Sequence, residues 1–222
     1  GNFSANVGIS TLFEDDTVQE TLRLELTRQG GTVPPLRIRC SQPRSTPLRW
    51  LSESPTGAQR EIMAEKMATS ADFNGEIWQV SWPDETEERV TIIGQRAWPM
   101  SDSETITLAT VDDASPQDGS VTLQTVPQLQ LDVQPSRLFT LLPESQPSYR
   151  EISRRQSVYR FAPRANIFAE DSQMRVEIRT ATETDRNWLT VWRMSTETYL
   201  DPVGIARDEV TLWIENQGAT QL

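Results

Sequence analysis

The chain has few side chains of the types that perform covalent or metal chemistry. Its 222 residues include no histidine and one cysteine, Cys40. Without an imidazole the chain has no Ser-His-Asp or Cys-His nucleophile system and no His-ligated metal. One cysteine forms neither an internal disulfide nor a thiolate zinc cage, and its alternation with Leu36 and Ile38 predicts a buried, unreactive thiol. The sequence therefore predicts no catalytic residue, no metal and no cofactor.

Carboxylates are the remaining candidates for catalysis. The 32 Asp and Glu residues gather in acidic runs at 14–16, 84–88 and 112–113. Each run lies in a turn-like context, which is typical of solvated turn residues. Two carboxylates at the right separation hydrolyse glycosides, and loop oxygens suit calcium. A carboxylate-only hydrolase and a calcium site are therefore alternatives, although no EF-hand loop is present.

The formal charge of −11 argues against nucleic acid as a partner, because an acidic chain is repelled by phosphate backbones. Basic residues gather in one stretch, residues 149–164. We predict anion or partner binding there by Arg150, Arg154, Arg155 and Arg160. The docking partner favoured by charge is the acidic N-terminal half. The alternative is a strand pair with ordinary outward-facing arginines.

Two pairs of tryptophans recur at the two-residue period of a strand. Trp78 and Trp82 share one face, as do Trp188 and Trp192. Exposed indoles on one face would form a stacking surface for sugars, so these four residues are candidate ligand-binding residues. The alternative is that they fill the core between two sheets.

Alternation of apolar and polar residues dominates the chain and predicts strands. The clearest runs cover residues 21–26, 36–40, 104–108, 120–123, 129–133, 174–178, 188–192 and 209–214. Asn74-Gly75 predicts a hairpin turn, and Asp118-Gly119 predicts a second turn. Residues 59–71 favour a strand over a short amphipathic helix. The fold class is therefore all-β, with two tandem antiparallel β-sandwich domains of immunoglobulin-like type.

A domain boundary is expected near Val126-Pro127, because the charge shifts there. Residues 1–126 carry −9 and residues 127–222 carry −2. Residues 21–32 also align without gaps on residues 209–220, at an offset of 188. The expected domains are thus 1–126 and 127–222, and the last strand is interpreted as the start of a further repeat.

Several of these motifs together resemble large bacterial cell-envelope proteins built from tandem β-sandwich repeats. The similar segments are Trp78–Val80, Val90–Ile93, Ser115–Leu123 and Arg175–Ile178. The resemblance implies an extracytoplasmic, membrane-tethered parent protein and no known activity. We therefore expect a non-enzymatic structural or interaction module whose partner is a protein or a polysaccharide. The alternative is a carbohydrate-binding module that uses exposed tryptophans and acidic residues.

Overall fold

The described part of the chain is built from β-strands. The computed structural model describes residues 3–30, 35–69, 73–82, 87–142, 155–163, 168–169, 172–181, 188–200 and 206–217. The chain divides into two compact units, Gly1–Arg179 (unit 1) and Thr180–Leu222 (unit 2). No α-helix occurs in the described ranges, which confirms the predicted all-β class. Accordingly, no helix in those ranges has the length and apolar character needed to cross a membrane.

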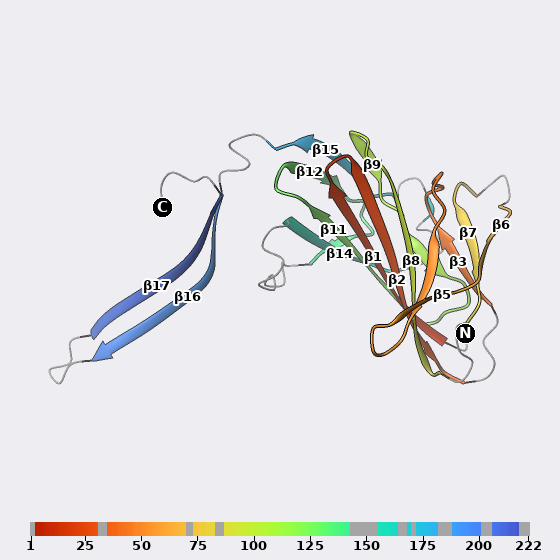
Figure 1. Cartoon of the computed structure of the whole chain (residues 1–222), viewed down its shortest axis with the longest axis horizontal. Helices are drawn as coiled ribbons and strands as arrows, with labels where there is room; N and C mark the ends of the chain where they lie inside the picture. The colour runs from red at the N-terminus through yellow and green to blue at the C-terminus, as the bar shows by residue number, and fades with distance from the viewer. Residues whose placement is uncertain are drawn as a thin grey trace. The chain divides into compact units, whose positions relative to one another are not determined.

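Unit 1 contains an eight-stranded sheet whose long strands lie side by side (Figure 1). In order across the sheet the strands are β13 (Thr140–Leu141), β14 (Arg155–Phe161), β11 (Gln117–Thr125), β1 (Phe3–Glu14), β2 (Thr17–Arg28), β8 (Arg89–Pro99), β4 (Arg49–Glu53) and β5 (Gln59–Glu61). All neighbouring pairs in this sheet are antiparallel except β1 and β11, which run parallel. The predicted antiparallel arrangement therefore has one parallel exception in this sheet.

Two smaller sheets complete the described part of unit 1. The four-stranded sheet has the order β10 (Ala109–Val111), β3 (Leu36–Cys40), β7 (Glu76–Val80) and β6 (Ala64–Met67). The three-stranded sheet has the order β12 (Leu129–Gln134), β15 (Arg175–Thr180) and β9 (Ser103–Thr105). Residues 59–71 contribute β5 and β6, so the preferred strand interpretation of that segment is confirmed. The run predicted at 104–108 forms a strand only as far as Thr105.

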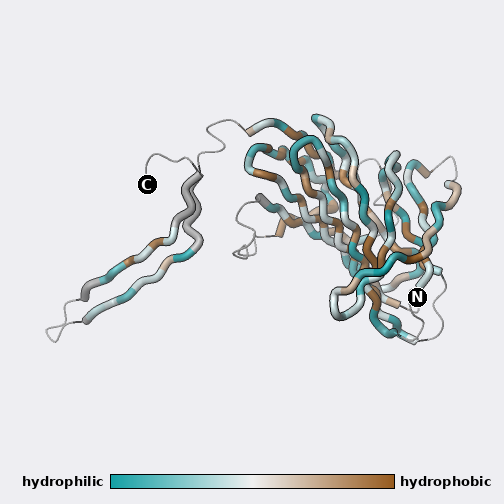
Figure 2. The backbone as a smooth tube through the Cα atoms, in the orientation of Figure 1, coloured by the Kyte–Doolittle hydropathy of each residue, from teal (hydrophilic) through white to brown (hydrophobic). Residues whose placement is uncertain are grey.

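The alternation seen in the sequence decides which face of each strand enters the core. Leu24 of β2, Ile38 of β3, Val80 of β7 and Val121 of β11 are all fully buried and belong to one hydrophobic cluster. Figure 2 shows hydrophobic and hydrophilic residues interleaved along the strands of unit 1. The eight-stranded and four-stranded sheets thus share one core and form a sandwich-like unit.

Strands on both sides of the expected boundary at Val126-Pro127 pair with each other. β14 pairs with β11 from Gly119↔Phe161 to Thr125↔Arg155, and β15 pairs with β9. The division between compact units lies instead at Arg179–Thr180. This observed division replaces the expected one, because hydrogen bonding joins residues that a charge shift along the sequence separates.

The predicted hairpin at Asn74-Gly75 is present, because β6 and β7 are antiparallel and these residues lie in their connection, but neither predicted glycine forms a two-residue turn. β6 and β7 pair with Met67 opposite Ile77, so residues 68–75 connect them and Asn74-Gly75 is not a two-residue turn. Gly119 lies inside β11, opposite Phe161. Neither glycine has a φ angle in the left-handed region. A tight turn is observed at Asp15-Asp16 between β1 and β2, where Asp15 has a φ of 50°.

Gly75 is required for a close approach of the backbone. A Cβ atom at this position would lie 2.4 Å from the carbonyl oxygen of Cys40. We expect Gly75→Ala to destabilise the protein by about 2–3 kcal/mol, because backbone must shift to admit the methyl group. The matched variant is Gly8→Ala, whose Cβ would have its nearest neighbour at an ordinary 3.6 Å. Equal melting temperatures for the two variants would contradict the assigned contact.

Unit 2 is described as one antiparallel hairpin. It consists of β16 (Trp188–Leu200) and β17 (Ala206–Gln217). The register runs from Trp188↔Gln217 to Leu200↔Ala206, with a β-bulge between Val191 and Arg193. Both predicted strands of this region, at 188–192 and 209–214, are therefore present and longer than predicted.

Candidate functional site

The structure places the first pair of candidate tryptophans in the protein interior. Trp78 is 5% exposed and packs edge-to-face on Trp50, with ring centroids 6.0 Å apart. Trp82 is partly buried and packs against Phe3, with centroids 6.2 Å apart. Trp78 therefore belongs to the core and Trp82 packs against the core while partly buried, which favours the core alternative for both. Trp188 and Trp192 belong to strand β16, but their side chains are not among those that the structure describes.

The structure does not bring the four candidate arginines together into a described site. Arg150 and Arg154 lie outside the described residues. Arg155 is the first residue of β14, and its side chain is not described. Arg160 lies on the same strand and is exposed. Anion or partner binding at these positions therefore stays a prediction.

The charged residues that the structure does bring together lie in the core of unit 1. We define the buried charge cluster as three carboxylates and three cations: Glu20, Glu76, Glu104, Arg44, Lys66 and Arg96. They come from different elements, because Glu20 lies on β2, Arg96 on β8, Glu76 on β7, Lys66 on β6 and Glu104 on β9, with Arg44 in the segment after β3. The cluster therefore connects all three sheets of unit 1.

Arg96 is the centre of the cluster, and its guanidinium is fully buried. Its Nε donates a hydrogen bond to Glu20 Oε1 at 2.8 Å, and its Nη1 donates to Glu76 Oε2 at 2.8 Å. Its Nη2 donates to the Thr107 hydroxyl at 3.2 Å. β2 and β8 place Glu20 directly opposite Arg96 in the sheet register. One arginine thus joins the eight-stranded sheet to the four-stranded sheet.

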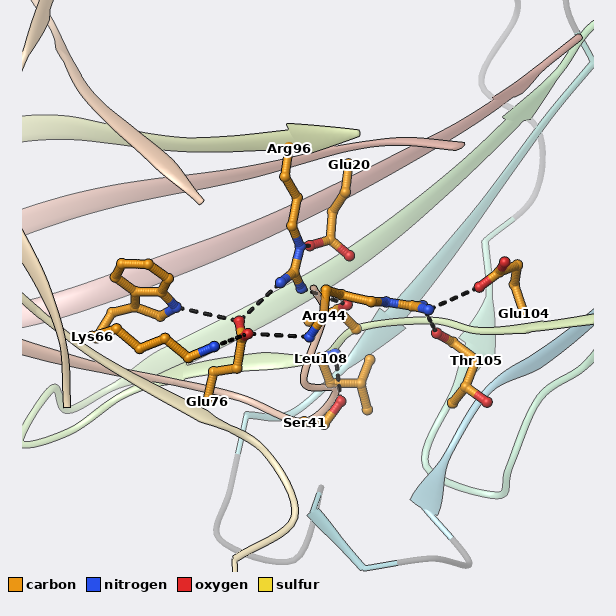
Figure 3. Close-up of polar contacts among 11 residues, drawn as sticks. Glu20, Ser41, Arg44, Lys66, Glu76, Arg96, Glu104, Thr105 and Leu108 are labelled. Carbon is orange, nitrogen blue, oxygen red and sulfur yellow. Dashed lines mark hydrogen bonds and ion pairs between the residues drawn. The ribbon is translucent and has the colours of Figure 1, made fainter. Parts of the chain in front are cut away.

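Glu76 accepts bonds from several directions (Figure 3). Lys66 Nζ donates to Glu76 Oε1 at 2.6 Å, and the Arg44 amide donates to the same oxygen at 3.1 Å. The indole of Trp78 donates to Glu76 Oε2 at 3.3 Å. The Arg44 side chain extends away and donates to Glu104 at 2.9 Å and to the Thr105 carbonyl at 2.7 Å. A carboxylate with this many donors is held in its ionised form.

The pKa of Glu76 reflects this balance. Burial raises the pKa of Glu76, but the hydrogen bonds from Lys66 and Arg44 and the charge of Arg96 together lower it by more, so the net pKa lies below its ordinary value. A carboxyl group whose pKa is lower in the folded state stabilises the fold above its unfolded pKa. This contribution is lost as the pH falls through the lowered pKa of Glu76 in the folded state.

The buried charge cluster is arranged for holding sheets together and not for reaching a substrate. The side chains of Glu20, Glu76 and Arg96 are at most 1% exposed. A catalytic acid or base must lie within hydrogen-bond reach of the group that it protonates or deprotonates, and these side chains have no solvent-facing atom. The three cations, of which Arg96 is buried, Arg44 partly buried and Lys66 45% exposed, also balance the three carboxylates and leave little net charge to attract an ion. The cluster is therefore best described as an ionic bridge between sheets.

One signal in the sequence marks three of these residues. Glu20 interrupts the apolar face of Val18, Leu22 and Leu24, and Arg96 and Glu76 occupy equivalent inward positions beside Trp98 and Trp78. A charge at an inward position of an alternating strand predicts a buried charge that needs a partner. These inward-facing charges are distinct from the acidic runs in turns at 14–16, 84–88 and 112–113.

The predicted thiol and two predicted turn clusters agree with the structure. Cys40 is fully buried, and burial raises the pKa of its thiol, so the predicted burial is confirmed. Asp15 and Asp16 are exposed in the turn between β1 and β2. Asp112 accepts hydrogen bonds from Arg39 at 2.9 and 3.1 Å at the surface. Within the described residues, no group of three or more acidic or cysteine side chains is placed to hold a metal ion.

A small polar pocket lies over β4, β5 and β8, with a volume of about 280 Å³. Glu53, Arg60 and Glu87 are among its lining residues. The hydrogen bond from Arg23 lowers the pKa of Glu53. This carboxylate is therefore ionised at neutral pH and paired with a guanidinium, which suits an ion pair and not proton transfer near neutral pH.

Comparisons with known proteins give a distant structural likeness. No protein-family model matches the chain, and no curated protein sequence matches it. Solved structures do match, among them native yeast LTA4 hydrolase, with 6% sequence identity and a TM-score of 0.44. The match covers 88% of this chain and 30% of the hydrolase.

The expectation that this chain is not an enzyme is withdrawn: it was drawn from missing residue types, and one solved structure that matches the chain is that of a hydrolase. The absence of histidine and of nucleophile motifs excludes particular mechanisms and does not exclude catalysis as a whole. At this identity and TM-score the likeness transfers neither an activity nor a functional residue to the chain.

Proposed function

We propose that this chain is a structural or interaction module from the ectodomain of a larger, membrane-tethered bacterial envelope protein. One observation carries the proposal. Six large hydrophobic side chains are exposed among the described residues, and four of them lie on the β16–β17 hairpin: Met194, Tyr199, Val210 and Leu212. Exposed apolar side chains gathered on one element are typical of a surface that binds another protein segment.

The construction of unit 1 supports a structural role. Its three sheets are joined by a common hydrophobic cluster and by the buried charge cluster, and both hold the sheets in one fixed arrangement. We propose that unit 1 is a variant of the immunoglobulin-like sandwich and that it is one member of a tandem array. The resemblance of its strands to repeat regions of bacterial envelope proteins supports an extracytoplasmic location.

A carbohydrate-binding role has less support. It requires exposed indoles, and Trp78 and Trp82 are packed in the interior. The polar pocket beside Glu53 contains no aromatic side chain among its lining residues. A protein segment is therefore the partner that we propose, in preference to a polysaccharide.

The proposed compartment is tested by protease accessibility in the native bacterium. Antibodies against this chain are used to follow the parent protein while proteinase K is added to intact cells, to cells with a permeabilised outer membrane and to lysed cells. We expect digestion before the cytoplasmic membrane is broken, while a cytoplasmic marker protein stays intact. Digestion of the parent protein only after lysis would contradict the proposal.

A further inference from the structure

The β16–β17 hairpin has the same cross-strand pattern as the β1–β2 hairpin that opens unit 1. The internal alignment of residues 21–32 on residues 209–220 matches β2 with β17 at an offset of 188 residues. The strand register within each hairpin provides an independent comparison. In the first hairpin Val7 lies opposite Leu24. In the second, Met194 lies opposite Leu212, at the equivalent place. An apolar pair thus occupies the same position in both.

A polar pair also occupies the same position in both hairpins. Thr11 lies opposite Glu20 in the first hairpin, and Thr198 lies opposite Asp208 in the second. The offset of 188 residues that matches Leu24 to Leu212 also places Glu20, one residue before the aligned segment, at the position of Asp208. A carboxylate among the apolar residues of a strand face is unusual, so its recurrence with a threonine partner indicates that the two hairpins are equivalent.

The surroundings of the equivalent faces differ. In unit 1 this face is buried, with Leu24 fully covered and Glu20 bonded to Arg96 of the neighbouring β8. β11 pairs with the other edge, along β1. In unit 2, Met194 is 67% exposed and Leu212 is 45% exposed. Asp208 is exposed and accepts a hydrogen bond from Thr198 at 2.6 Å, and β16 and β17 pair only with each other among the described strands.

The opposite face of the hairpin has the character of a surface. Its cross-strand pairs include Glu197 opposite Glu209 and Ser195 opposite Thr211. Two like charges directly opposite each other are tolerated in water and are destabilising in a core. Three exposed apolar side chains, Met194, Val210 and Leu212, thus share one face, while the other face carries these polar pairs and Tyr199 opposite Arg207.

We propose that β16–β17 is the first hairpin of a second domain of the unit 1 type, and that its apolar face is covered by that domain's own later strands. These strands are equivalent to β8 and β11 and follow on the same polypeptide, as they do in unit 1. The strand beside β17 supplies a cation to Asp208, as β8 supplies Arg96 to Glu20. This inference rests on the part of the proposed function that makes the chain a member of a tandem array.

Cysteine accessibility in the full-length parent polypeptide tests the inference. Leu212→Cys reports on the apolar face and Thr211→Cys on the opposite face, while the buried Cys40 serves as an unreactive background. Each variant is labelled with a maleimide in the 222-residue chain and in the full-length protein. We expect both to react rapidly in the 222-residue chain. In the full-length protein, labelling of Leu212→Cys should fall by about tenfold or more while that of Thr211→Cys is unchanged.

Hydrogen exchange on the unmodified proteins provides a readout that does not depend on a substitution. The amides of β16 and β17 that point outward from the hairpin edges should be protected in the full-length protein and exchange rapidly in the 222-residue chain. Asp208→Arg should restore rapid exchange in the full-length protein, because the positive charge of the new side chain would repel the cation expected on the neighbouring strand. Glu209→Arg, on the other face, should not.

Two outcomes would overturn the inference. One is equal labelling of Leu212→Cys and Thr211→Cys in the full-length protein. The other is protection of Leu212→Cys in the 222-residue chain that rises with protein concentration, which would assign the face to a second copy of the chain. Protease accessibility in cells reports only on the compartment, so the proposed location and this inference fail separately.

Discussion

Replacing Arg96 with methionine is expected to lower the free energy of unfolding by about 4 kcal/mol. The guanidinium is fully buried and bonds to Glu20 and Glu76. Its removal leaves Glu20 as a buried carboxylate without its ionic partner, and Glu76 with Lys66 as its remaining ionic contact. Loss of one member of a buried ion network is costly because the remaining charges were desolvated on folding. Urea denaturation of the wild type and the variant measures the difference.

The matched control for Arg96→Met is Arg39→Met. Arg39 also pairs with a carboxylate, Asp112, at 2.9 Å, but its side chain is 38% exposed. Exposed pairs contribute about 0–1 kcal/mol, so this variant should unfold at nearly the wild-type urea concentration. If Arg96→Met were as mild as Arg39→Met, the assignment of the cluster as the ionic bridge between sheets would be wrong.

Replacing Leu24 with aspartate is expected to destabilise unit 1 by about 5 kcal/mol, or to prevent folding. Leu24 is fully buried at the centre of the eight-stranded sheet, opposite Val7 on β1 and Ile92 on β8. A carboxylate at this position would have no cationic partner. Glu20, four residues earlier on the same face of β2, differs because it is bonded to Arg96. Circular dichroism during a thermal melt measures the loss.

The neighbouring Arg23 provides the control for the face assignment. Alternation alone predicts that Arg23→Asp is nearly silent, but the structure modifies this expectation. Arg23 donates hydrogen bonds to Glu53 at 2.8 Å and to Glu25 at 3.2 Å, so an aspartate would face two carboxylates. Arg23→Gln is the better control and should cost about 1 kcal/mol or less. A loss equal to that of Leu24→Asp would show that the faces of β2 are assigned incorrectly.

The strands themselves could be predicted from the sequence, because a two-residue period is a local property. The run at 36–40 coincides with β3, and the run at 21–26 lies within β2. The buried positions of Cys40 and Leu24 also follow from alternation. The turns could not be predicted in the same way. Gly75 is a glycine because the Cys40 carbonyl lies close by, and Cys40 is distant in the sequence.

The candidate site could be predicted only in outline. Glu20 and Arg96 stand at inward positions of alternating strands, which is visible in the sequence. Their pairing depends on the register of β2 against β8 and on the approach of β7 from another sheet. The tryptophans were ambiguous for a related reason, because alternation shows that Trp78 and Trp82 share a face and does not show whether another sheet covers it.

The amino-acid sequence alone determined that the protein is all-β, which side chains share a strand face, and that no imidazole or thiolate-pair chemistry is available. These properties follow from residue types and from the local geometry of an extended chain. The tertiary structure decided which strands are neighbours: β14 returns to β11 across the expected boundary, and Arg96 meets Glu20 and Glu76. Such pairings join residues far apart in the sequence, and they are selected by the combined burial of whole sheets, which no local pattern contains.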